Sequence, residues 1–268
     1  MSVLDAHVHV WRPSALPYPW LASMPALDRD LGPADIDDAG GEITEWVFVE
    51  ADSAAPREET EWVAALDWPG LRGIVAKADL RDLRLDEIAA TRGVVGVRHL
   101  LQDQPITDDL VPGLRAVGES GLTFDACVRR QQLPTLADLL AEAPGTRTVL
   151  DHVGKPAVAM GLASAEGREW AAGIRRIAEL PHVFVKLSGL PAEGGLGPDF
   201  LRVALEAFGP ERCMFGGDWP VSGVPGAGVP VRDALDIVRA VVGAEGADRV
   251  FGDVARTFYG LTARVDLR

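Results

Sequence analysis

The sequence predicts a single-domain (β/α)8 barrel that occupies residues 1–268. Short apolar segments rich in β-branched residues recur at near-regular intervals, and stretches with helical periodicity lie between them. Such alternation is typical of a parallel sheet. Eight strands in a chain of this length favour a closed barrel over an open, doubly wound sheet, which is the alternative architecture.

Eight segments have the length and composition of buried strands. Each is bounded by turn-forming or helical sequence, as expected for strands connected by helices. The segments are Val3–Val10, Trp46–Ala51, Leu71–Ala76, Val94–Leu100, Leu122–Val128, Arg147–Val153, Val183–Ser188 and Cys213–Asp218.

The clearest helical periods occur in 131–143 and 165–179, where apolar residues three or four positions apart fall on one face. Prolines and a candidate N-cap mark further helix starts. The apolar residues are Leu133, Leu136, Leu139 and Leu140 in the first segment and Trp170, Ile174 and Ile177 in the second; the start signals are Pro33, Pro198, Pro230 and Thr107.

Two irregular stretches interrupt this pattern. Arg12–Gly32 follows the first strand and is rich in proline and tryptophan, whereas Gly189–Pro198 follows the seventh strand and is rich in glycine. Loops that follow barrel strands lie at the C-terminal mouth, where active sites form. We therefore expect both stretches to be lids or packed surface loops of that mouth.

The composition restricts the partners and the compartment. The 26 basic and 40 acidic side chains give a net charge of −14, which disfavours nucleic acid and anionic membranes as partners. No apolar run is long enough to span a bilayer, and the N-terminus lacks the pattern of a signal peptide, so we expect a cytoplasmic protein. Cys127 and Cys213 lack metal-binding spacing and are expected to be buried thiols. The sequence leaves homo-oligomerisation open.

The first strand carries the sharpest candidate motif, Asp5-Ala-His7-Val-His9. Because side chains alternate across a strand, the three polar residues are expected on one face. If that face looks into the barrel, His7 and His9 can bind a divalent cation or polarise a substrate carbonyl. The alternative is that they are ordinary surface histidines near the N-terminus.

Two further strands end in candidate catalytic residues. His152 follows an apolar strand and precedes Gly154 and Lys155; alone, it is equally consistent with a core or turn histidine. Asp218 follows Gly216-Gly217, which we expect to leave room for a substrate or metal beside the carboxylate. A carboxylate among imidazoles suits a general base or a metal ligand, although Asp218 can also simply cap a helix.

Several residues near strand ends are candidates for binding a substrate. Arg98 and Lys186 can hold an anionic or carbonyl-bearing group, and tryptophans can stack on a ring. The full set of substrate-binding candidates is Glu50, Arg98, Asp125, Lys155, Lys186, Trp11 and Trp219. The sequence has no GxSxG, GxxxxGK[ST], GxGxxG or HExxH motif, which disfavours serine hydrolases, NTPases, Rossmann dehydrogenases and zincin-type metalloproteases.

Taken together, these motifs resemble the amidohydrolase superfamily, specifically the amidohydrolase 2 branch with its L-fuconolactonase-like and 2-pyrone-4,6-dicarboxylate lactonase-like members. The motifs span nearly the whole chain in the order found in the family. They are DAHVHVW from Asp5, GVRH from Gly96, LDHVGKP from Leu150, VKLSGL from Val185, FGGDWP from Phe215 and VFGDVARTFYG from Val250.

The resemblance implies a barrel hydrolase that opens a small-molecule lactone. It implies that Asp218 activates water while His7, His9 and His152 polarise the carbonyl. The chain departs from the binuclear members, because the fourth strand offers Arg98 and His99 in place of the bridging lysine, and the fifth strand offers Asp125 in place of a histidine. We therefore expect either no metal or one divalent ion, with zinc favoured, held by His7, His9, His152 and Asp218.

Three questions stay open at this stage. The substrate can be a carboxylate-bearing lactone held by Arg98, Lys155 and Lys186, or a sugar lactone stacked on Trp11, Trp20 or Trp219. Related barrels decarboxylate aromatic acids with one zinc ion, which is the alternative activity. A barrel that only binds a partner would require loss of the site, yet all four core residues are present.

Overall fold

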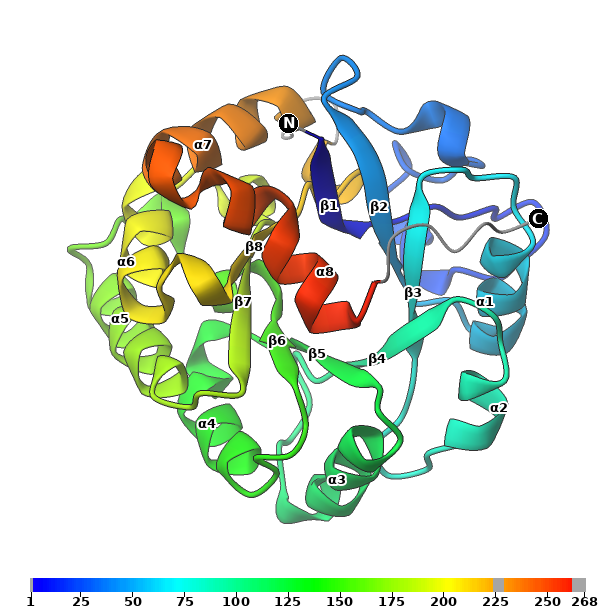
Figure 1. Ribbon diagram of the computed structural model, residues 1–268, viewed down its shortest axis with the longest axis horizontal. Coiled ribbons are helices and arrows are strands. Elements are labelled where there is room, and N and C mark those ends of the chain that lie inside the picture. The colour runs from blue at the N-terminus through cyan, green and yellow to red at the C-terminus, as the bar shows by residue number, and fades with distance from the viewer. Residues whose placement is uncertain (1, 224–228, 262–268) are drawn as a thin grey trace.

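Eight parallel strands form one sheet, in the order in which they occur in the sequence (Figure 1). The computed structural model describes residues 2–223 and 229–261. The predicted (β/α)8 architecture is confirmed. The strands are β1 (Val3–Val8), β2 (Ile43–Val49), β3 (Leu71–Lys77), β4 (Val94–Leu100), β5 (Thr123–Cys127), β6 (Thr148–Leu150), β7 (Val183–Leu187) and β8 (Cys213–Phe215).

Helices surround the ring of strands, and the short helix α8 lies across one end of it (Figure 1). The predicted helix over 131–143 begins as a 3-10 turn and becomes α-helical at Leu133, whereas the helix predicted over 165–179 is nearly as expected. The helices are α1 (Pro56–Ala64), α2 (Leu85–Ala89), α3 (Val111–Glu119), α4 (Leu133–Ala141), α5 (Ala165–Ala178), α6 (Pro198–Phe208), α7 (Val231–Asp248) and α8 (Val254–Tyr259).

Backbone hydrogen bonds close the ring between β1 and the residues that follow β8. The Asp218 N–H donates to the carbonyl oxygen of His7 at 2.8 Å, and the His9 N–H donates to the carbonyl oxygen of Trp219 at 2.9 Å. Val8 and Trp219 form the matching parallel bridge. The closure therefore brings the first and last predicted site motifs side by side.

Among the strands that are shorter than the sequence predicts, β6 and β8 differ most from the predicted ranges, because the chain turns sharply soon after each of them. After β6, His152 and Val153 have φ values of 53° and 45°, in the left-handed region that ends an extended strand. After β8, Asp218 has a φ of 53°. Both site residues thus lie on turns beyond the strand ends.

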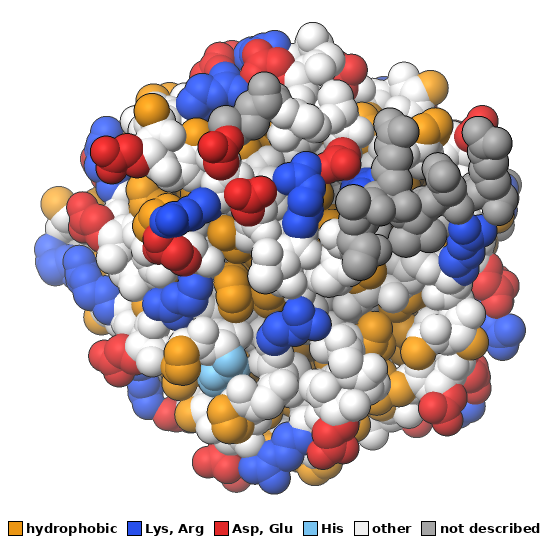
Figure 2. Space-filling view, in the orientation of Figure 1, with side chains coloured by type: hydrophobic (Ala, Val, Ile, Leu, Met, Phe, Trp, Pro, Cys, Tyr) orange, Lys and Arg blue, Asp and Glu red, His pale blue; other side chains and the backbone are white. Residues whose placement is uncertain are grey.

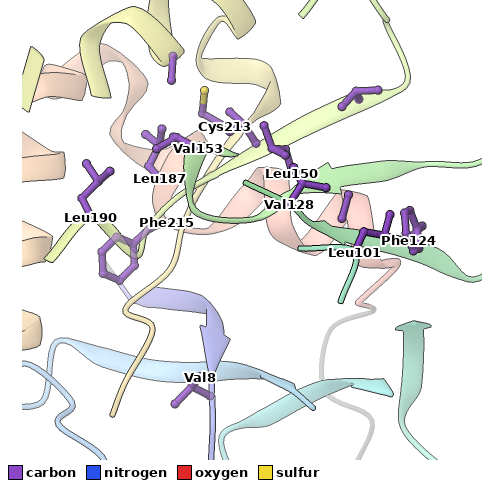
Figure 3. Packing of buried hydrophobic residues seen from close by; sticks show 14 of the residues in the cluster. Val8, Leu101, Phe124, Val128, Leu150, Val153, Leu187, Leu190, Cys213 and Phe215 are labelled. Carbon is purple, nitrogen blue, oxygen red and sulfur yellow. The ribbon is translucent and has the colours of Figure 1, made fainter. Parts of the chain in front are cut away.

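The interior of the barrel is closed at one end by apolar side chains. Phe258 and Tyr259 of α8 pack in one cluster with Leu4 and Met214 from the strands. A second, larger cluster lies between the strands and the surrounding helices, where Phe124, Leu150 and Phe215 are buried (Figure 3). Because α8 plugs one end, a polar site has room only at the opposite end, where the strands terminate.

The faces of β1 do not alternate as predicted. Leu4 and Ala6 belong to the interior cluster, whereas Val8 belongs to the outer one, and the pairing with β2 is irregular between Asp5 and Val8. This irregularity changes which side chains face inward. Asp5 therefore does not share a face with His7, and its carboxylate instead accepts hydrogen bonds from the backbone N–H groups of His7 and Gly217 at 2.9 and 2.8 Å.

The face that carries α8 shows acidic and basic side chains intermixed, with hydrophobic side chains between them (Figure 2). Cys127 and Cys213 are free, buried thiols, as predicted. Within residues 2–223 and 229–261, the helices are all too short or too polar to cross a lipid bilayer.

We predict that Gly217→Ala destabilises the ring closure. A Cβ atom at position 217 would lie 2.5 Å from Asp5 Oδ2 and 3.2 Å from Val231 Cγ1, so the end of β8 has to move away from β1. Overpacking of this kind costs about 1–3 kcal/mol, which thermal or urea denaturation can measure. The control is Gly145→Ala, where an added methyl group has no heavy atom within 4 Å. Equal stability of the two variants would contradict the prediction.

Candidate active site

Asp218 lies at the centre of the predicted residues. Its Oδ1 atom is 3.8 Å from His7 Nε2, 3.6 Å from His9 Nε2 and 3.7 Å from His152 Nε2. The Ser222 hydroxyl donates to the other oxygen, Oδ2, at 2.6 Å, and the backbone of Asp218 is fixed by the ring closure. The structure therefore brings together all four residues predicted to form the core of the site.

His152 is held in place from both sides of its ring. Its backbone φ of 53° turns the side chain out of the line of β6, and Ser188 Oγ lies 2.9 Å from His152 Nδ1. Gly189 has a φ of 70°, and any side chain at that position would overlap the His152 ring. The glycine after β7 thus makes room for the imidazole of His152.

Gly216 and Gly217 serve a different purpose from the one expected. A Cβ at Gly216 would lie 2.8 Å from His7 Cβ and 3.0 Å from Ser188 Cβ, and the one at Gly217 would meet Asp5. The expectation that they leave room for a substrate is wrong. They allow the end of β8 to approach β1 and β7, which the close approach of Asp218 to the histidines requires.

The hydrogen bonds of His7 and His9 determine where their protons lie. A carbonyl oxygen only accepts, so His9 Nδ1 donates to Val49 O at 2.7 Å and His9 Nε2 keeps its lone pair. Lys186 Nζ donates to His7 Nδ1 at 3.1 Å, which leaves the proton on His7 Nε2. His7 Nε2 then donates to His9 Nε2 at 3.2 Å. Lys186, His7 and His9 thus form a chain in which each group donates a hydrogen bond to the next, and His9 donates to Val49 O.

Burial and charge separate the protonation states of the acid and the imidazoles. Burial lowers the pKa of His152 to about 4, and burial together with the Lys186 charge lowers the pKa of His7. Burial opposes ionisation of Asp218, but His152, His9 and His7 outweigh it and hold the pKa of that carboxyl well below its usual range. At neutral pH the site thus holds the ionised Asp218 beside neutral His7 and neutral His152.

A layer of buried charge lies directly beneath the histidines. Lys186 Nζ is 2.5 Å from Asp125 Oδ2 and 3.1 Å from Asp151 Oδ1, and Asp151 Oδ1 is 3.3 Å from His7 Nδ1. The Tyr259 hydroxyl of α8 donates to Asp125 Oδ2 at 2.8 Å. Lys186 and Asp125 are fully buried, so they support His7 and do not face the cavity as the sequence led us to expect.

Glu50 and Arg98 form a second buried pair beside this layer. Arg98 Nε donates to Glu50 Oε1 at 2.6 Å, and Arg98 Nη2 donates to the Glu50 carbonyl oxygen at 2.5 Å. A further Arg98 nitrogen is 3.6 Å from Asp151. Two of the five N–H donors of Arg98 are therefore used in this pair, and Glu50 offsets its charge, which leaves Arg98 less available to a substrate than the sequence suggests.

A cavity of about 230 Å³ opens above Asp218. Of the predicted residues, those that line it are His9, Trp11, Arg98, His152, Lys155 and Asp218, whereas His7, Glu50, Asp125, Lys186 and Trp219 do not. Both irregular stretches supply walls, since Trp11 and Trp20 flank one side and Gly189, Ala192 and Glu193 another. Trp219 acts through its backbone, whose carbonyl oxygen closes the ring.

Sequence reasoning assigned no role to four residues that now border the site. Asp151 stands within the quoted LDHVGKP motif, and a second acid next to a candidate histidine is a signal that could have identified it. Ser188 is a polar residue at the end of the seventh predicted strand, within the quoted VKLSGL motif, but Ser222 carries no signal of this kind. Tyr259 stands in the quoted VFGDVARTFYG motif and lies in a helix at the far end of the barrel. These residues are Asp151, Ser188, Ser222 and Tyr259.

The donor set fits one divalent cation. Donor atoms of His7, His152 and Asp218 all lie within 4.8 Å of one another, and His9 Nε2 adjoins them. Ligands of a tetrahedral zinc with bonds of about 2.0–2.1 Å are about 3.3 Å apart; the distance between His7 and His9 is 3.2 Å, and those from Asp218 Oδ1 to the three histidines are 3.6–3.8 Å. Ligation by His7 Nε2 requires its proton to move to Nδ1, where Asp151 is placed to accept the hydrogen bond.

The buried charges around the histidines also favour a cation. Unbalanced buried charge is costly, and an ion of opposite sign offsets it. Four buried carboxylates surround two buried cations, so negative charge is in excess. The cations are Arg98 and Lys186, and the carboxylates are Glu50, Asp125, Asp151 and Asp218.

Comparisons with known proteins place the chain in a family. A family model described as amidohydrolase matches residues 4–261. An L-fucono-1,5-lactonase of Burkholderia multivorans is 36% identical over 242 residues, which cover 81% of this chain and 82% of that protein. An L-fucono-1,5-lactonase of Burkholderia ambifaria is 31% identical over 282 residues, which cover 96% and 94% respectively.

A solved structure agrees with this assignment. The crystal structure of an amidohydrolase from Burkholderia multivorans with bound zinc has a TM-score of 0.85 and 31% identity to this chain, and the match covers 98% of this chain and 100% of that one. The resemblance found in the motifs is therefore confirmed over almost the whole barrel. The chain belongs to the amidohydrolase family, in the branch that includes these lactonase relatives.

Proposed function

We propose that this hydrolase opens the ring of a sugar lactone, with Asp218 as the general base. The observation that carries the proposal is the single carboxylate oxygen, Asp218 Oδ1, that faces three imidazoles at the floor of the cavity. The similarity to two L-fucono-1,5-lactonases supports lactone hydrolysis as the class of reaction.

In the first step Asp218 removes a proton from a water molecule in the cavity. The carboxylate is available as a base because its pKa is held low, and the Ser222 hydroxyl fixes its orientation through Oδ2. The oxygen of the water bonds to the lactone carbonyl carbon, and the carbonyl electron pair moves onto its oxygen. A tetrahedral oxyanion results.

Imidazole N–H groups stabilise this oxyanion. His152 Nε2, which lines the cavity, carries a proton when the Ser188 hydroxyl donates to His152 Nδ1. His7 Nε2 carries a proton because Lys186 donates to His7 Nδ1, but it donates that proton to His9, so His7 stabilises the oxyanion only when this hydrogen bond breaks. Each donor of this kind typically contributes about 3–4 kcal/mol to lowering the barrier.

Collapse of the oxyanion breaks the bond between the carbonyl carbon and the ring oxygen. Asp218 returns its proton to that oxygen, so the products are a hydroxyl group and a carboxylic acid. A divalent cation bound by His7, His9, His152 and Asp218 would add Lewis-acid polarisation of the carbonyl.

The walls of the cavity favour a neutral sugar ring over a carboxylate-bearing lactone. Arg98 is already paired with Glu50, and Lys155 shares the lining of the cavity with the carboxylates of Glu193 and Asp218, which repel an anionic substrate. Trp11 and Trp20 pack edge to face with their centroids 5.2 Å apart, and both line the cavity, where they offer apolar surface to a ring.

Asp218→Asn tests the general base. The amide keeps the shape of the side chain but cannot accept the proton, so we expect kcat on L-fucono-1,5-lactone or another accepted sugar lactone to fall at least ~100-fold. Asp199→Asn, on the exposed first turn of α6, is the matched control and keeps the wild-type rate. Hydrolysis at a near wild-type rate by a folded Asp218→Asn protein would refute the mechanism.

The pH profile tests the assignment of His152 as neutral. With a His152 pKa of about 4, kcat/KM should stay level between about pH 6 and 8 and fall only at lower pH, as protonated His152 pairs with Asp218 and removes the base. The measurement is initial rate against pH, corrected for spontaneous hydrolysis. An inflection near the ordinary histidine pKa would contradict the assignment.

Metal removal tests the role of a cation and separates lactonase from decarboxylase chemistry. We expect the isolated protein to bind one zinc ion per chain, measured by mass spectrometry of the metal, and we expect His152→Ala to weaken zinc binding.

Lactone hydrolysis should persist in part after chelation, because Asp218 and His7 still act. Complete loss that zinc restores would make the ion essential to the reaction, and release of CO₂ from an aromatic acid would favour the decarboxylase.

A further inference from the structure

A second polar cavity adjoins the active-site cavity over the ends of β2, β3 and β4. Its volume is about 440 Å³. It shares the lining residues Asp52, Leu100 and Gln102 with the active-site cavity, so the two spaces meet along one wall. The two cavities are therefore neighbours, and a substituent long enough to pass this wall would enter the second one.

The size of the active-site cavity makes this extension relevant. Its volume of about 230 Å³ lies below the roughly 300–1,000 Å³ typical of small-molecule pockets. With the adjoining cavity included, the available space falls within that range. The site as a whole thus suits a substrate larger than a single lactone ring.

His99 provides a buried donor in the wall of the second cavity. Its ring is more than nine-tenths buried, at 9% side-chain exposure. His99 Nδ1 accepts from the Leu80 N–H at 3.3 Å, so the neutral ring carries its proton on Nε2. Among the described residues, no hydrogen-bond partner of that Nε2 atom is found, and the ring lines the cavity.

Other lining groups supply both donors and acceptors. Gln102 Oε1 accepts from Lys155, which leaves the NH₂ group of Gln102 for a ligand. Gln104 Nε2 donates to Leu100 O at 2.9 Å, which leaves the side-chain oxygen of Gln104, Oε1, as an acceptor for a ligand. A hydroxyl group both donates and accepts, so it matches such a mixed lining.

The charge of the second cavity disfavours an anion. One lysine and three aspartates line it, namely Lys77 with Asp52, Asp79 and Asp103. Lys77 Nζ is already 2.6 Å from Asp52 Oδ1, so it is not a free cation for a carboxylate or phosphate. The lining therefore disfavours an anionic group and suits a hydroxylated one.

We propose that this cavity is a second substrate subsite that holds a glycosyl substituent, so that the preferred substrates are glycosylated sugar lactones. The inference rests on the proposed lactone hydrolysis and adds the substrate class. The glycosyl bond is not broken: water opens the lactone at Asp218, and the product is the corresponding aldobionic acid.

The kinetic test compares lactones that share one reacting ring. The probes are glucono-1,5-lactone and its glucosylated forms linked through O3, O4 and O6, the O4 form being cellobiono-1,5-lactone. At least one glycosylated lactone should exceed glucono-1,5-lactone in kcat/KM by about tenfold or more, mainly through a lower KM, as expected for added binding contacts. Equal or lower kcat/KM for all three glycosylated forms would overturn the proposal.

Two variants locate the effect. Gln104→Trp fills the cavity from its exposed rim, and His99→Asn keeps an acceptor for the Leu80 amide while removing the ring. Both should bring the ratio of kcat/KM for the glycosylated and plain lactones close to one. Gln131→Trp, an exposed position outside both cavities, is the matched control and should keep the wild-type ratio. A ratio unchanged in Gln104→Trp would place the glycosyl group elsewhere and refute the subsite.

A binding measurement separates this inference from the proposed reaction. Calorimetric titration of the Asp218→Asn protein with gluconate and with the three glucosylated gluconates requires no turnover. Tighter binding of a glucosylated product supports the subsite even if every lactone proves inert, a result that would refute only the proposed reaction. Equal binding of all products would refute the subsite, whatever the hydrolysis assays show.

Discussion

The active site depends on the two backbone hydrogen bonds that close the barrel. They join His7 to Asp218 and His9 to Trp219, residues about two hundred positions apart in the chain. Because the closing residues carry the side chains of the proposed site, the position of Asp218 relative to the imidazoles is set by sheet geometry. Gly216 and Gly217 make this approach possible, since a side chain at either position would meet β1. The contacts that close the barrel are therefore also the contacts that assemble the proposed site.

Beneath the site, buried charge controls the chemistry of the histidines. Lys186 is held between Asp125 and Asp151, and its position against His7 Nδ1 decides which nitrogen of His7 carries the proton. Asp151, which also pairs with Lys186, can accept a hydrogen bond from His7 Nδ1 when that nitrogen carries the proton and His7 Nε2 binds a cation. One arrangement thus suits both an oxyanion donor and a metal ligand. Charged groups out of contact with water interact strongly, which is why this layer is effective.

The two ends of the barrel have opposite character. The end covered by α8 is filled with apolar side chains, and Tyr259 alone reaches from that helix to a buried carboxylate. The other end combines a small reaction cavity with a larger polar one, separated by a wall that includes Gln102. Gln102 contacts Lys155 on one side and lines both cavities, so the proposed ring and its proposed substituent would both lie against Gln102.

Sequence alone determined the barrel and the core of the site. Strand and helix periods are local properties, and parallel strands end at one mouth, so the strand-end positions of His7, His9, His152 and Asp218 predicted their meeting. The faces of β1, the supporting role of Lys186 and Asp125, and the pairing of Arg98 with Glu50 were not predictable in this way. They depend on an irregular register and on contacts between strands far apart in sequence, which exist only once the ring has closed. Tertiary structure therefore decided which polar residues face the substrate and which hold the others in place.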